Sequence, residues 1–119
     1  QDHVPFWDLE FTDGSTEPRD SSAAAIAVCG IMEMLPFLGA EEAVRYHGAA
    51  MDILASLISS YAVQEVRPGA GLLAHGTYAK HSPYNTIPTD RGVDECTTWG
   101  DYFYLEALVR ASRSWTPYW

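Results

Sequence analysis

The sequence predicts an all-α fold in which three main helices are joined by long loops. Three segments carry apolar residues at helical spacing and are bounded by helix start and stop signals: residues 20–36, 41–62 and 99–112. The segments around them are rich in Pro, Gly and Ser. The helices also carry apolar residues on more faces than three helices can cover. We therefore expect part of a larger all-helical toroid, in which inner and outer helices alternate.

Composition and charge restrict the class of protein. The chain has 119 residues, 47% of them hydrophobic and 13% aromatic, which predicts an ordered domain with one core. Seven Lys and Arg against sixteen Asp and Glu give a net charge of -9. Because this charge repels phosphate backbones and anionic lipids, we expect no nucleic acid and no membrane as partners.

Hydrophobic runs, cysteines and the first residue give expectations about solubility, thiol state and processing. No apolar run reaches the roughly 18 residues needed to span a membrane, so we expect a soluble protein and favour the cytoplasm. Cys29 and Cys96 lack CxxC spacing, which favours free thiols over a disulfide. The chain begins at Gln1 and not at Met, which indicates a processed or partial chain.

The first helix is predicted to begin at Asp20 and to end at Pro36. Residues 1–19 mix aromatic and acidic residues with Pro and Gly, a composition typical of extended chain and turns. Asp20 and the serines after it can accept hydrogen bonds from first-turn amides, whereas Pro36 lacks the N–H that a continuing helix needs. Small side chains within "AAAIAVCGIMEML" let other backbones approach closely, so we expect this helix to be packed inside.

The second helix is predicted over residues 41–62. It opens with Glu41 and Glu42, whose charges suit the positive end of the helix dipole. Apolar residues recur at three- and four-residue spacing in two stripes, which are Tyr46, Ala50, Ile53, Leu57 and Tyr61, and Val44, Met51, Leu54 and Ile58. Apolar residues on two faces predict burial between two layers.

Residues 66–93 are predicted to form a long loop, and a third helix follows it. A loop of this length inside a compact domain is uncommon and often functional. The third helix is predicted to run from near Trp99 to about Ser112, with Thr97 or Thr98 as its cap.

The loop "LLAHGTYAKHSPYNT" carries the candidate binding residues His75, Tyr78, Lys80 and His81. Their imidazole, phenol and ammonium groups donate hydrogen bonds that can hold an acidic sugar or a carboxylate on an otherwise negative protein. A solvated loop without a ligand is the alternative interpretation. A metal site is not expected, because the two histidines lack a third ligand and a closer spacing.

Other polar residues fit structural roles better. Asp94 and Glu95 are neighbours that normally point apart, so with Asp101 they are expected to stabilise a helix start rather than to act as acid and base. Ser21 and Ser22 lack the GxSxG turn of a hydrolase nucleophile and are expected to cap a helix. The chain contains neither GxxxxGK[ST] nor GxGxxG, so nucleotide chemistry has no support.

The aromatic residues can serve either as core or as platforms for sugar rings. The four tryptophans are Trp7, Trp99, Trp115 and Trp119. Because large aromatic side chains dominate cores, we expect core packing for each of them. Trp99, Tyr102 and Phe103, at the start of the third helix, are likewise expected to close a packed interface.

Three strings in this order resemble the C-terminal third of the unsaturated glucuronyl hydrolases of glycoside hydrolase family 88. They are "DSSAAAIAVCGIMEM" from Asp20, "GLLAHGTYAKHS" from Gly71, and "GVDECTTWGDYFYLEALVR" from Gly92, followed by "SWTPYW". The resemblance covers essentially the whole chain. It implies an (α/α)₆ barrel, or six-hairpin toroid, in which residues 1–119 are the C-terminal segment of a single catalytic domain whose N-terminal part is absent.

The resemblance implies a glycoside hydrolase that releases terminal 4,5-unsaturated glucuronic acid from oligosaccharides left by polysaccharide lyases. In this family a carboxylic acid protonates the double bond of the sugar and water adds across it; the resulting hemiketal opens and expels the rest of the chain. No metal and no organic cofactor are implied. The catalytic aspartates of the family lie in segments without a counterpart here, so no catalytic role passes to Asp20, Asp94 or Asp101. The 119-residue chain alone is therefore expected to be inactive.

The resemblance also implies a substrate loop beside the sugar that follows the unsaturated one. Members that accept sulfated fragments carry a Ser-x-x-Ser-x-Lys pattern there, and the matching positions here are Gly76, Ala79 and His81. Since two hydroxyls and an ammonium are replaced, sulfate recognition is not expected, whereas Tyr78 remains able to pack against a sugar. The expected substrate-binding residues are His75, Gly76, Tyr78, Ala79 and His81.

The implied partners are an unsaturated uronate oligosaccharide and the remaining barrel helices, from the parent chain or from a second chain. A non-catalytic carbohydrate-binding or interaction module is one alternative, although the sequence shows no regularly spaced row of exposed aromatics. An unsaturated rhamnogalacturonyl hydrolase is another, although "WGDYFYLEAL" fits the glucuronyl group better.

Overall fold

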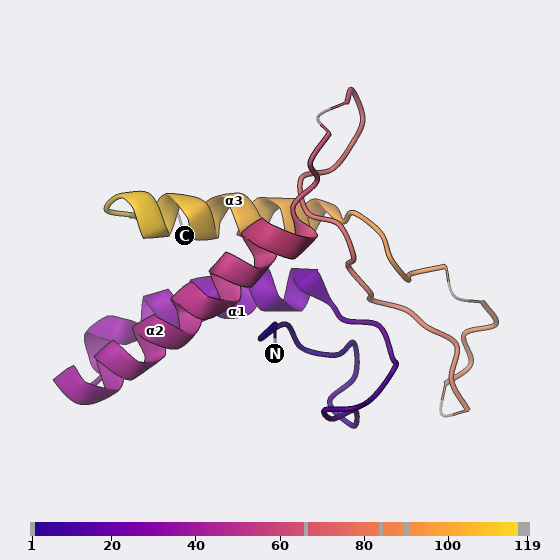
Figure 1. Cartoon of the computed structure of the whole chain (residues 1–119), viewed down its shortest axis with the longest axis horizontal. Coiled ribbons are helices and arrows are strands. Elements are labelled where there is room, and N and C mark those ends of the chain that lie inside the picture. The colour runs from indigo at the N-terminus through magenta and orange to yellow at the C-terminus, as the bar shows by residue number, and fades with distance from the viewer. Residues whose placement is uncertain (1, 66, 84, 90, 117–119) are drawn as a thin grey trace.

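The computed structural model is helical and describes residues 2–65, 67–83, 85–89 and 91–116. Its main helices are α1 (Ser21–Met34), α2 (Ala40–Ser56) and α3 (Thr98–Ser112). A 3₁₀ turn, η1 (Leu35–Phe37), joins α1 to α2, and a π-helical turn, η2 (Leu57–Tyr61), extends α2. In Figure 1 the N-terminal arm and the long loop before α3 both extend from the same end of the three helices.

The start of α1 confirms the predicted cap at Asp20, whose carboxylate accepts a hydrogen bond from the Ser22 amide at 3.0 Å. The two serines, however, do more than cap the helix. The Ser21 hydroxyl donates to the Ala74 carbonyl at 2.6 Å and so ties the long loop to α1. The helix ends one residue before η1, where Pro36 stops regular α-helical hydrogen bonding.

The second helix confirms the predicted span with two differences. It begins at Ala40 after Gly39, which has no side-chain cap, and its last turn widens into the π-helical η2. One stripe is buried, with Ala50 and Leu57 fully inaccessible. The other is buried in its middle, where Leu54 is 4% exposed and Met51 packs against the core, and open at its ends, where Val44 is 75% exposed and Ile58 is 47% exposed. The expected burial on two faces is therefore met in the middle of α2 but not at the ends of the second stripe.

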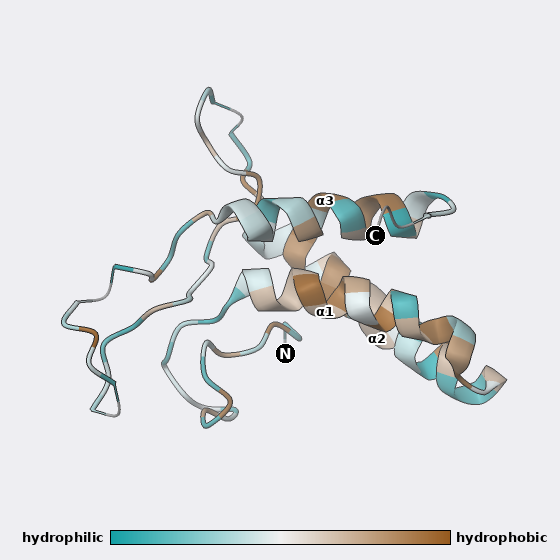
Figure 2. Ribbon diagram, turned by 180° about the vertical axis from the view of Figure 1, so that it is seen from behind, coloured by the Kyte–Doolittle hydropathy of each residue, from teal (hydrophilic) through white to brown (hydrophobic). Residues whose placement is uncertain are grey.

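The core lies where α1 contacts both other helices. Small side chains permit this approach, and a Cβ on Gly100 of α3 would lie 3.2 Å from the Ser22 Cβ of α1. Cys29 is a buried free thiol and Cys96 an exposed one, as predicted. The outer side of α1 remains open, because Ile26 is 42% exposed. In Figure 2 the brown, apolar residues gather on the helices, and the two long loops are mostly pale or teal.

The shape is more extended than that of a compact domain. The radius of gyration is 15.2 Å, compared with about 13.5 Å expected for a chain of this length. Three large side chains on α3 are exposed at three-residue spacing: Trp99 at 43%, Tyr102 at 42% and Leu105 at 49%. As predicted, the helices carry more apolar surface than they can cover among themselves. In the part of the chain that is described, none of the helices has the length and apolar content needed to cross a membrane.

Candidate functional site

The loop between η2 and α3 is held by isolated β-bridges and not by strands. Gly76 and Glu95 exchange two backbone hydrogen bonds at 2.8 and 3.0 Å, and Ala79 pairs with Gly92. Glycine is required at position 92, because a Cβ there would lie 2.7 Å from the backbone nitrogen of Ala79. These contacts fold the loop back on itself and hold the segment from His75 to Ala79.

Asp20 joins this loop to the start of α1. Its carboxylate accepts from the Ser22 hydroxyl at 2.7 Å and from the Thr77 amide at 3.2 Å. The Ser21 amide donates to the His75 carbonyl at 3.3 Å. The helix cap predicted from sequence therefore also positions the predicted substrate loop.

His75 and Asp94 are joined by a hydrogen bond between the His75 Nδ1 and the Asp94 Oδ1. Both residues have left-handed backbone conformations, with φ of 64° at His75 and 60° at Asp94. Such conformations are uncommon for residues other than glycine and often occur at functional sites. Because the carboxylate accepts, Nδ1 carries the proton, and Nε2 is left as the second hydrogen-bonding atom of the ring.

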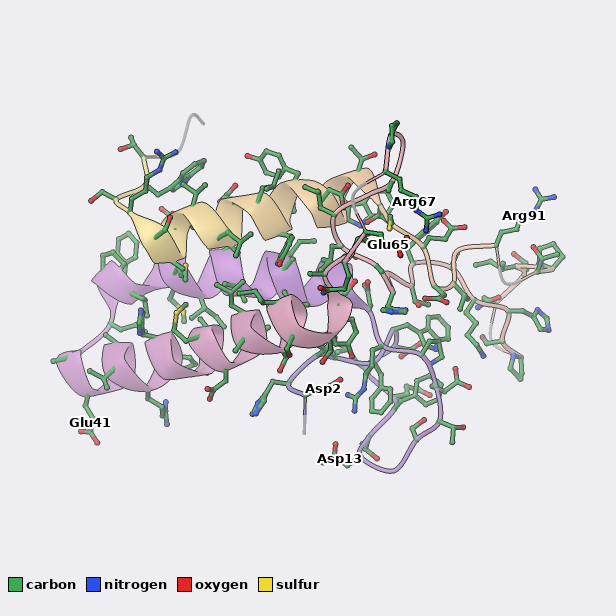
Figure 3. All side chains as sticks on the ribbon, turned by 45° about the horizontal axis from the view of Figure 1, so that its top comes forward. Asp2, Asp13, Glu41, Glu65, Arg67 and Arg91 are labelled. Atoms are coloured by element: carbon green, nitrogen blue, oxygen red, sulfur yellow. The ribbon has the colours of Figure 1, made fainter. Side chains whose placement is uncertain are left out.

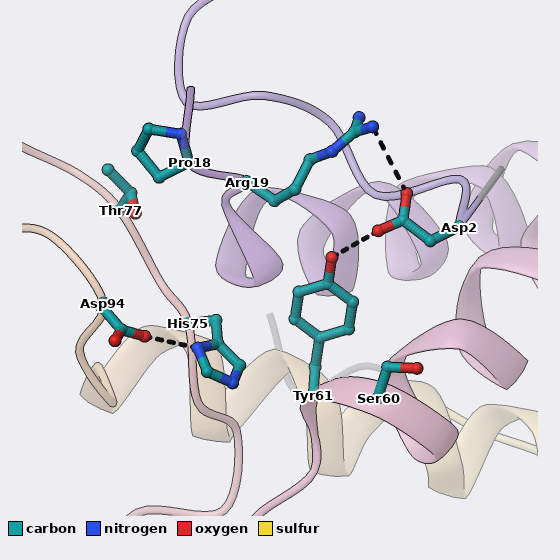
Figure 4. Close-up of a pocket in the computed structure, with 8 residues that line it drawn as sticks. All are labelled: Asp2, Pro18, Arg19, Ser60, Tyr61, His75, Thr77 and Asp94. Atoms are coloured by element: carbon teal, nitrogen blue, oxygen red, sulfur yellow. Dashed lines mark hydrogen bonds and ion pairs between the residues drawn. The ribbon is translucent and has the colours of Figure 1, made fainter. Parts of the chain in front are cut away.

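His75 lines a cavity of about 490 Å³, here named the His75 cavity. Its other lining residues come from the N-terminal arm, from the end of η2 and from the loop, and Figure 4 draws them: Asp2, Pro18, Arg19, Ser60, Tyr61, Thr77 and Asp94. The ring of Tyr61 meets His75 edge to face at 5.8 Å. A cavity of this volume falls within the range of small-molecule sites.

A second polar network forms the opposite wall of the His75 cavity. The Tyr61 hydroxyl donates to Asp2 at 2.5 Å, and Arg19 lies 3.8 Å from the same carboxylate. Burial of the phenol, followed by the hydrogen bond to Asp2, raises the pKa of Tyr61 well above its usual value. Tyr61 therefore stays protonated and acts as a hydrogen-bond donor.

Thr77 adds an unsatisfied group to this cavity. The residue is 2% exposed, and its Oγ1 has no hydrogen-bond partner among the described residues. Buried hydroxyls normally have a partner, because leaving one unpaired costs about 1–3 kcal/mol. The Thr77 side chain is therefore a buried, unsatisfied polar group in the wall of this cavity.

Tyr78 and Trp99 form an exposed aromatic pair beside the loop. Their rings meet edge to face at 5.3 Å, and both residues are about half exposed. The Tyr78 hydroxyl donates to Glu95 at 3.1 Å, and the Trp99 indole donates to the Ser22 hydroxyl at 3.2 Å. The hydrogen bond to Glu95 raises the pKa of Tyr78. The expected core packing of Trp99 is thus wrong within this chain.

The remaining aromatic predictions have mixed outcomes. Phe103 packs against the core, as expected, whereas its edge-to-face neighbour Tyr102 is exposed on α3. The indole of Trp7 donates to Glu17 at 2.9 Å in the N-terminal arm, away from the helical core. Trp115 stacks with Arg110 at 5.5 Å after α3. Trp119 lies outside the described residues.

The structure separates the predicted loop residues into two groups. His75, Gly76 and Tyr78 lie near the Asp20 cap, whereas Lys80 and His81 lie further out. Lys80 forms an ion pair with Glu17 at 3.0 Å, and the His81 Nδ1 donates to the Ile87 carbonyl at 2.5 Å. The predicted donors therefore do not converge on one point.

Gly76 and Ala79 occupy crowded backbone positions. A Cβ on Gly76 would lie 3.0 Å from the Glu95 carbonyl oxygen and 3.4 Å from a methyl group of Thr97. A serine at position 76 would therefore require its neighbours to move.

From sequence, Asp94 and Asp101 are expected to stabilise a helix start rather than to act as acid and base. Asp101 lies in the first turn of α3, as expected, and also accepts hydrogen bonds from the Leu72 and Leu73 amides, each at 2.9 Å, so that it holds the start of the loop. Asp2, Arg19 and Tyr61 were not recognised as site residues. They come from two distant segments, and no local motif marks them. In the described part of the chain, no group of three or more His, Cys, Asp or Glu is arranged to hold a metal ion.

No protein-family model matches the chain. The unsaturated chondroitin disaccharide hydrolase of Streptococcus pyogenes serotype M1 is 50% identical over 121 residues, covering 100% of this chain and 29% of that protein. The unsaturated glucuronyl hydrolase of Bacillus sp. (strain GL1) is 36% identical over 121 residues, covering 100% of this chain and 30% of that protein. Along its whole length the chain is similar to a segment that makes up 29–30% of these hydrolases.

Solved structures agree with the sequence relatives. The crystal structure of the unsaturated glucuronyl hydrolase from Streptococcus agalactiae matches with a TM-score of 0.85 at 48% identity, over 99% of this chain and 30% of that one. A mutant of that enzyme has been solved in complex with dGlcA-GalNAc6S. These enzymes are (α/α)₆ barrels, so the three helices described here are a fragment of such a barrel, as the resemblance implied.

Proposed function

We propose that the protein carrying this chain is an unsaturated glucuronyl hydrolase. It releases a terminal 4,5-unsaturated glucuronic acid from lyase-generated oligosaccharides by hydration of the double bond. Residues 1–119 form the C-terminal segment of its single (α/α)₆-barrel catalytic domain. The observation that carries this proposal is the match along 99% of the chain, at 48% identity and a TM-score of 0.85, to an enzyme of this activity. The chain spans only about 30% of that enzyme, so the rest of the barrel must come from elsewhere.

In this proposal the chain supplies a wall of the substrate site and not the catalytic acid. The substrate-binding residues are His75, Gly76, Tyr78, Ala79 and His81. The Asp94 carboxylate fixes the His75 ring, so its Nε2 can accept a hydrogen bond from a sugar hydroxyl. The exposed Tyr78 and Trp99 rings offer an apolar surface to the face of a sugar.

We also propose a preference for unsulfated substrates. Gly76 and Ala79 bring no hydroxyl to the loop, and Lys80 is neutralised by Glu17 at 3.0 Å. A sulfate bound here would lack the charged and hydroxyl donors that such groups need. Equal or faster turnover of a 6-sulfated disaccharide than of its unsulfated counterpart would overturn this preference.

The activity is tested on the full-length protein. Hydration of the unsaturated uronate abolishes its ultraviolet absorbance, and we expect that loss with an unsaturated glucuronyl disaccharide. His75→Ala should lower kcat/KM about tenfold, because the hydrogen bond between the sugar and the His75 ring is lost. His47→Ala, at an exposed position on α2, is the matched control and should stay within about twofold of wild type.

Two results would contradict the proposal. Full-length protein that leaves the absorbance unchanged is not such a hydrolase. Saturable binding of the oligosaccharide without cleavage would instead identify a carbohydrate-binding module. Titration calorimetry alongside the absorbance assay separates these two outcomes.

A further inference from the structure

A second cavity lies between the N-terminal arm and the outer part of the loop. Its volume is about 380 Å³, and none of its lining residues lines the His75 cavity. The lining side chains used below are Trp7, Glu10, Phe11, Glu17, Lys80 and His81. In Figure 3 side chains crowd this side of the molecule, beyond the end of the helices. We name it the Trp7 cavity.

The walls of the Trp7 cavity are held in place by contacts between the two segments. Glu17 accepts from the Trp7 indole at 2.9 Å and pairs with Lys80 at 3.0 Å, so one carboxylate links the arm to the loop. The Trp7 amide also donates to the Pro18 carbonyl at 3.1 Å. Asn85 braces the loop by donating to the Lys80 carbonyl at 2.9 Å. The cavity is therefore formed before any ligand arrives.

The cavity combines an apolar face with a polar rim. The Trp7 and Phe11 rings lie 6.0 Å apart and tilted by 38°, and both residues are partly exposed. The rim carries the carboxylate of Glu10, the Lys80 ammonium and the His81 imidazole. Aromatic rings flanked by a few hydrogen-bonding groups suit a ligand with an apolar face and a hydroxylated edge, as a pyranose has.

The charge of the cavity restricts the class of sugar. Three carboxylates, those of Asp8, Glu10 and Glu17, face one ammonium, Lys80. Lys80 is engaged with Glu17, so the remaining carboxylates leave the cavity negative. A sulfated or uronic sugar would be repelled there.

We propose that the Trp7 cavity binds a neutral sugar of the oligosaccharide. That sugar lies further along the chain than the one at the His75 cavity. The Trp7 and Phe11 rings hold its apolar face, and Glu10, Lys80 and His81 bind its hydroxyls. The protein accordingly favours oligosaccharides longer than a disaccharide that carry no charge on this sugar. The identity of the oligosaccharide rests on the proposed function, whereas the shape and charge of the Trp7 cavity do not depend on it.

The binding test uses the full-length protein and cellotetraose, a neutral saturated tetrasaccharide that cannot be hydrated. We expect saturable binding by saturation-transfer difference NMR, weakened about three- to tenfold by Trp7→Ala. Trp7→Phe keeps a ring and should recover most of the affinity. Phe37→Ala removes a ring that is 84% exposed on η1 and is the matched control. Absence of binding, or equal affinity in the Trp7→Ala protein, overturns the proposal.

A charge reversal provides an independent test that leaves the fold intact. The Glu10 side chain is exposed at the rim, so Glu10→Lys changes the charge without opening the core. We expect this variant to bind a tetrasaccharide sulfated on its internal sugars at least about threefold more tightly than wild type does. Unchanged affinity contradicts the assigned role of charge.

The two proposals fail in different ways. If the protein binds cellotetraose through Trp7 but hydrates no unsaturated disaccharide, the proposed function is wrong and the sugar-binding role of the Trp7 cavity is supported. If the protein hydrates the disaccharide, but turns over an unsaturated neutral tetrasaccharide equally well with and without Trp7, the proposed function is supported. The sugar-binding role of the Trp7 cavity is then wrong.

Discussion

Gly71 lies where the loop crosses the turn that precedes α3. A Cβ at this position would lie 2.4 Å from the Cys96 Cβ and 3.1 Å from the Asp101 Oδ2. Because Asp101 also holds the Leu72 and Leu73 amides, crowding here would disturb the anchor of the whole loop. An added Cβ at Gly71 is therefore expected to shift the loop that carries His75.

Gly71→Ala should lower the free energy of unfolding by about 1–3 kcal/mol, because the added methyl group has no space. Gly48→Ala is the matched control. Gly48 lies inside α2 with nothing within 4 Å of an added Cβ, so alanine should stabilise the helix by about 0.5–1 kcal/mol. Urea unfolding followed by circular dichroism measures both changes. A neutral Gly71→Ala would show that the crossing is looser than described.

Asp2 gives the wall of the His75 cavity a dependence on pH. Burial by itself raises the pKa of Asp2, but the hydrogen bond from Tyr61, the Val4 amide and the charge of Arg19 outweigh it and leave the pKa below 3.8. A carboxyl with a lowered pKa stabilises the folded state above its unfolded pKa. That contribution is lost as the pH falls through the folded pKa.

The stability difference between wild type and Asp2→Asn should therefore be largest near neutral pH and should close below about pH 4. Urea midpoints measured between pH 7 and pH 2.5 test this. A difference that is constant over this range would mean that Asp2 gains nothing from being charged.

At the scale of elements, α3 depends on its first turn. Thr97 is 7% exposed, and its hydroxyl accepts from the Gly100 amide at 3.1 Å. The same turn packs Gly100 against Ser22, so the cap also sets the distance between α3 and α1. The cap thus influences both helix stability and the position of the Tyr78 and Trp99 pair.

Thr97→Ala should cost about 1 kcal/mol of stability, and Thr97→Ser should cost much less because it keeps the hydroxyl. Thermal unfolding of the two variants side by side measures the difference. Equal losses in both would assign the effect to the lost methyl group and not to the cap.

The helices were predictable from sequence because their ends carry local signals. Asp20, Pro36 and Thr97 act on their immediate neighbours, so sequence spacing alone reveals them. The π-helical turn at Leu57–Tyr61 was not predictable, since no local sequence signal marks it; Tyr61 at its end contacts Asp2 and His75, which belong to other segments. The same is true of the left-handed conformation of His75 and Asp94, which arises from the folded loop.

At the scale of the whole molecule, exposed apolar faces on α2 and α3 indicate further neighbours in the fold. The sequence predicts more apolar helix faces than three helices can cover, and such exposed faces are present on α2 and α3. The structural match to a segment of a larger barrel explains them, because the other helices of such a barrel can cover these faces. The site was less predictable. The sequence predicts His75 as a site residue, but Arg19 and Tyr61 line the same cavity from segments more than forty residues apart. Only the folded chain brings them together.

We propose above that this chain forms one wall of a hydrolase and does not carry the catalytic acid. The most direct test compares residues 1–119 with the full-length protein in the same absorbance assay, using an unsulfated unsaturated glucuronyl disaccharide. We predict turnover by the full-length protein and none by residues 1–119. Turnover by residues 1–119 alone, or none by the full-length protein, would contradict the account.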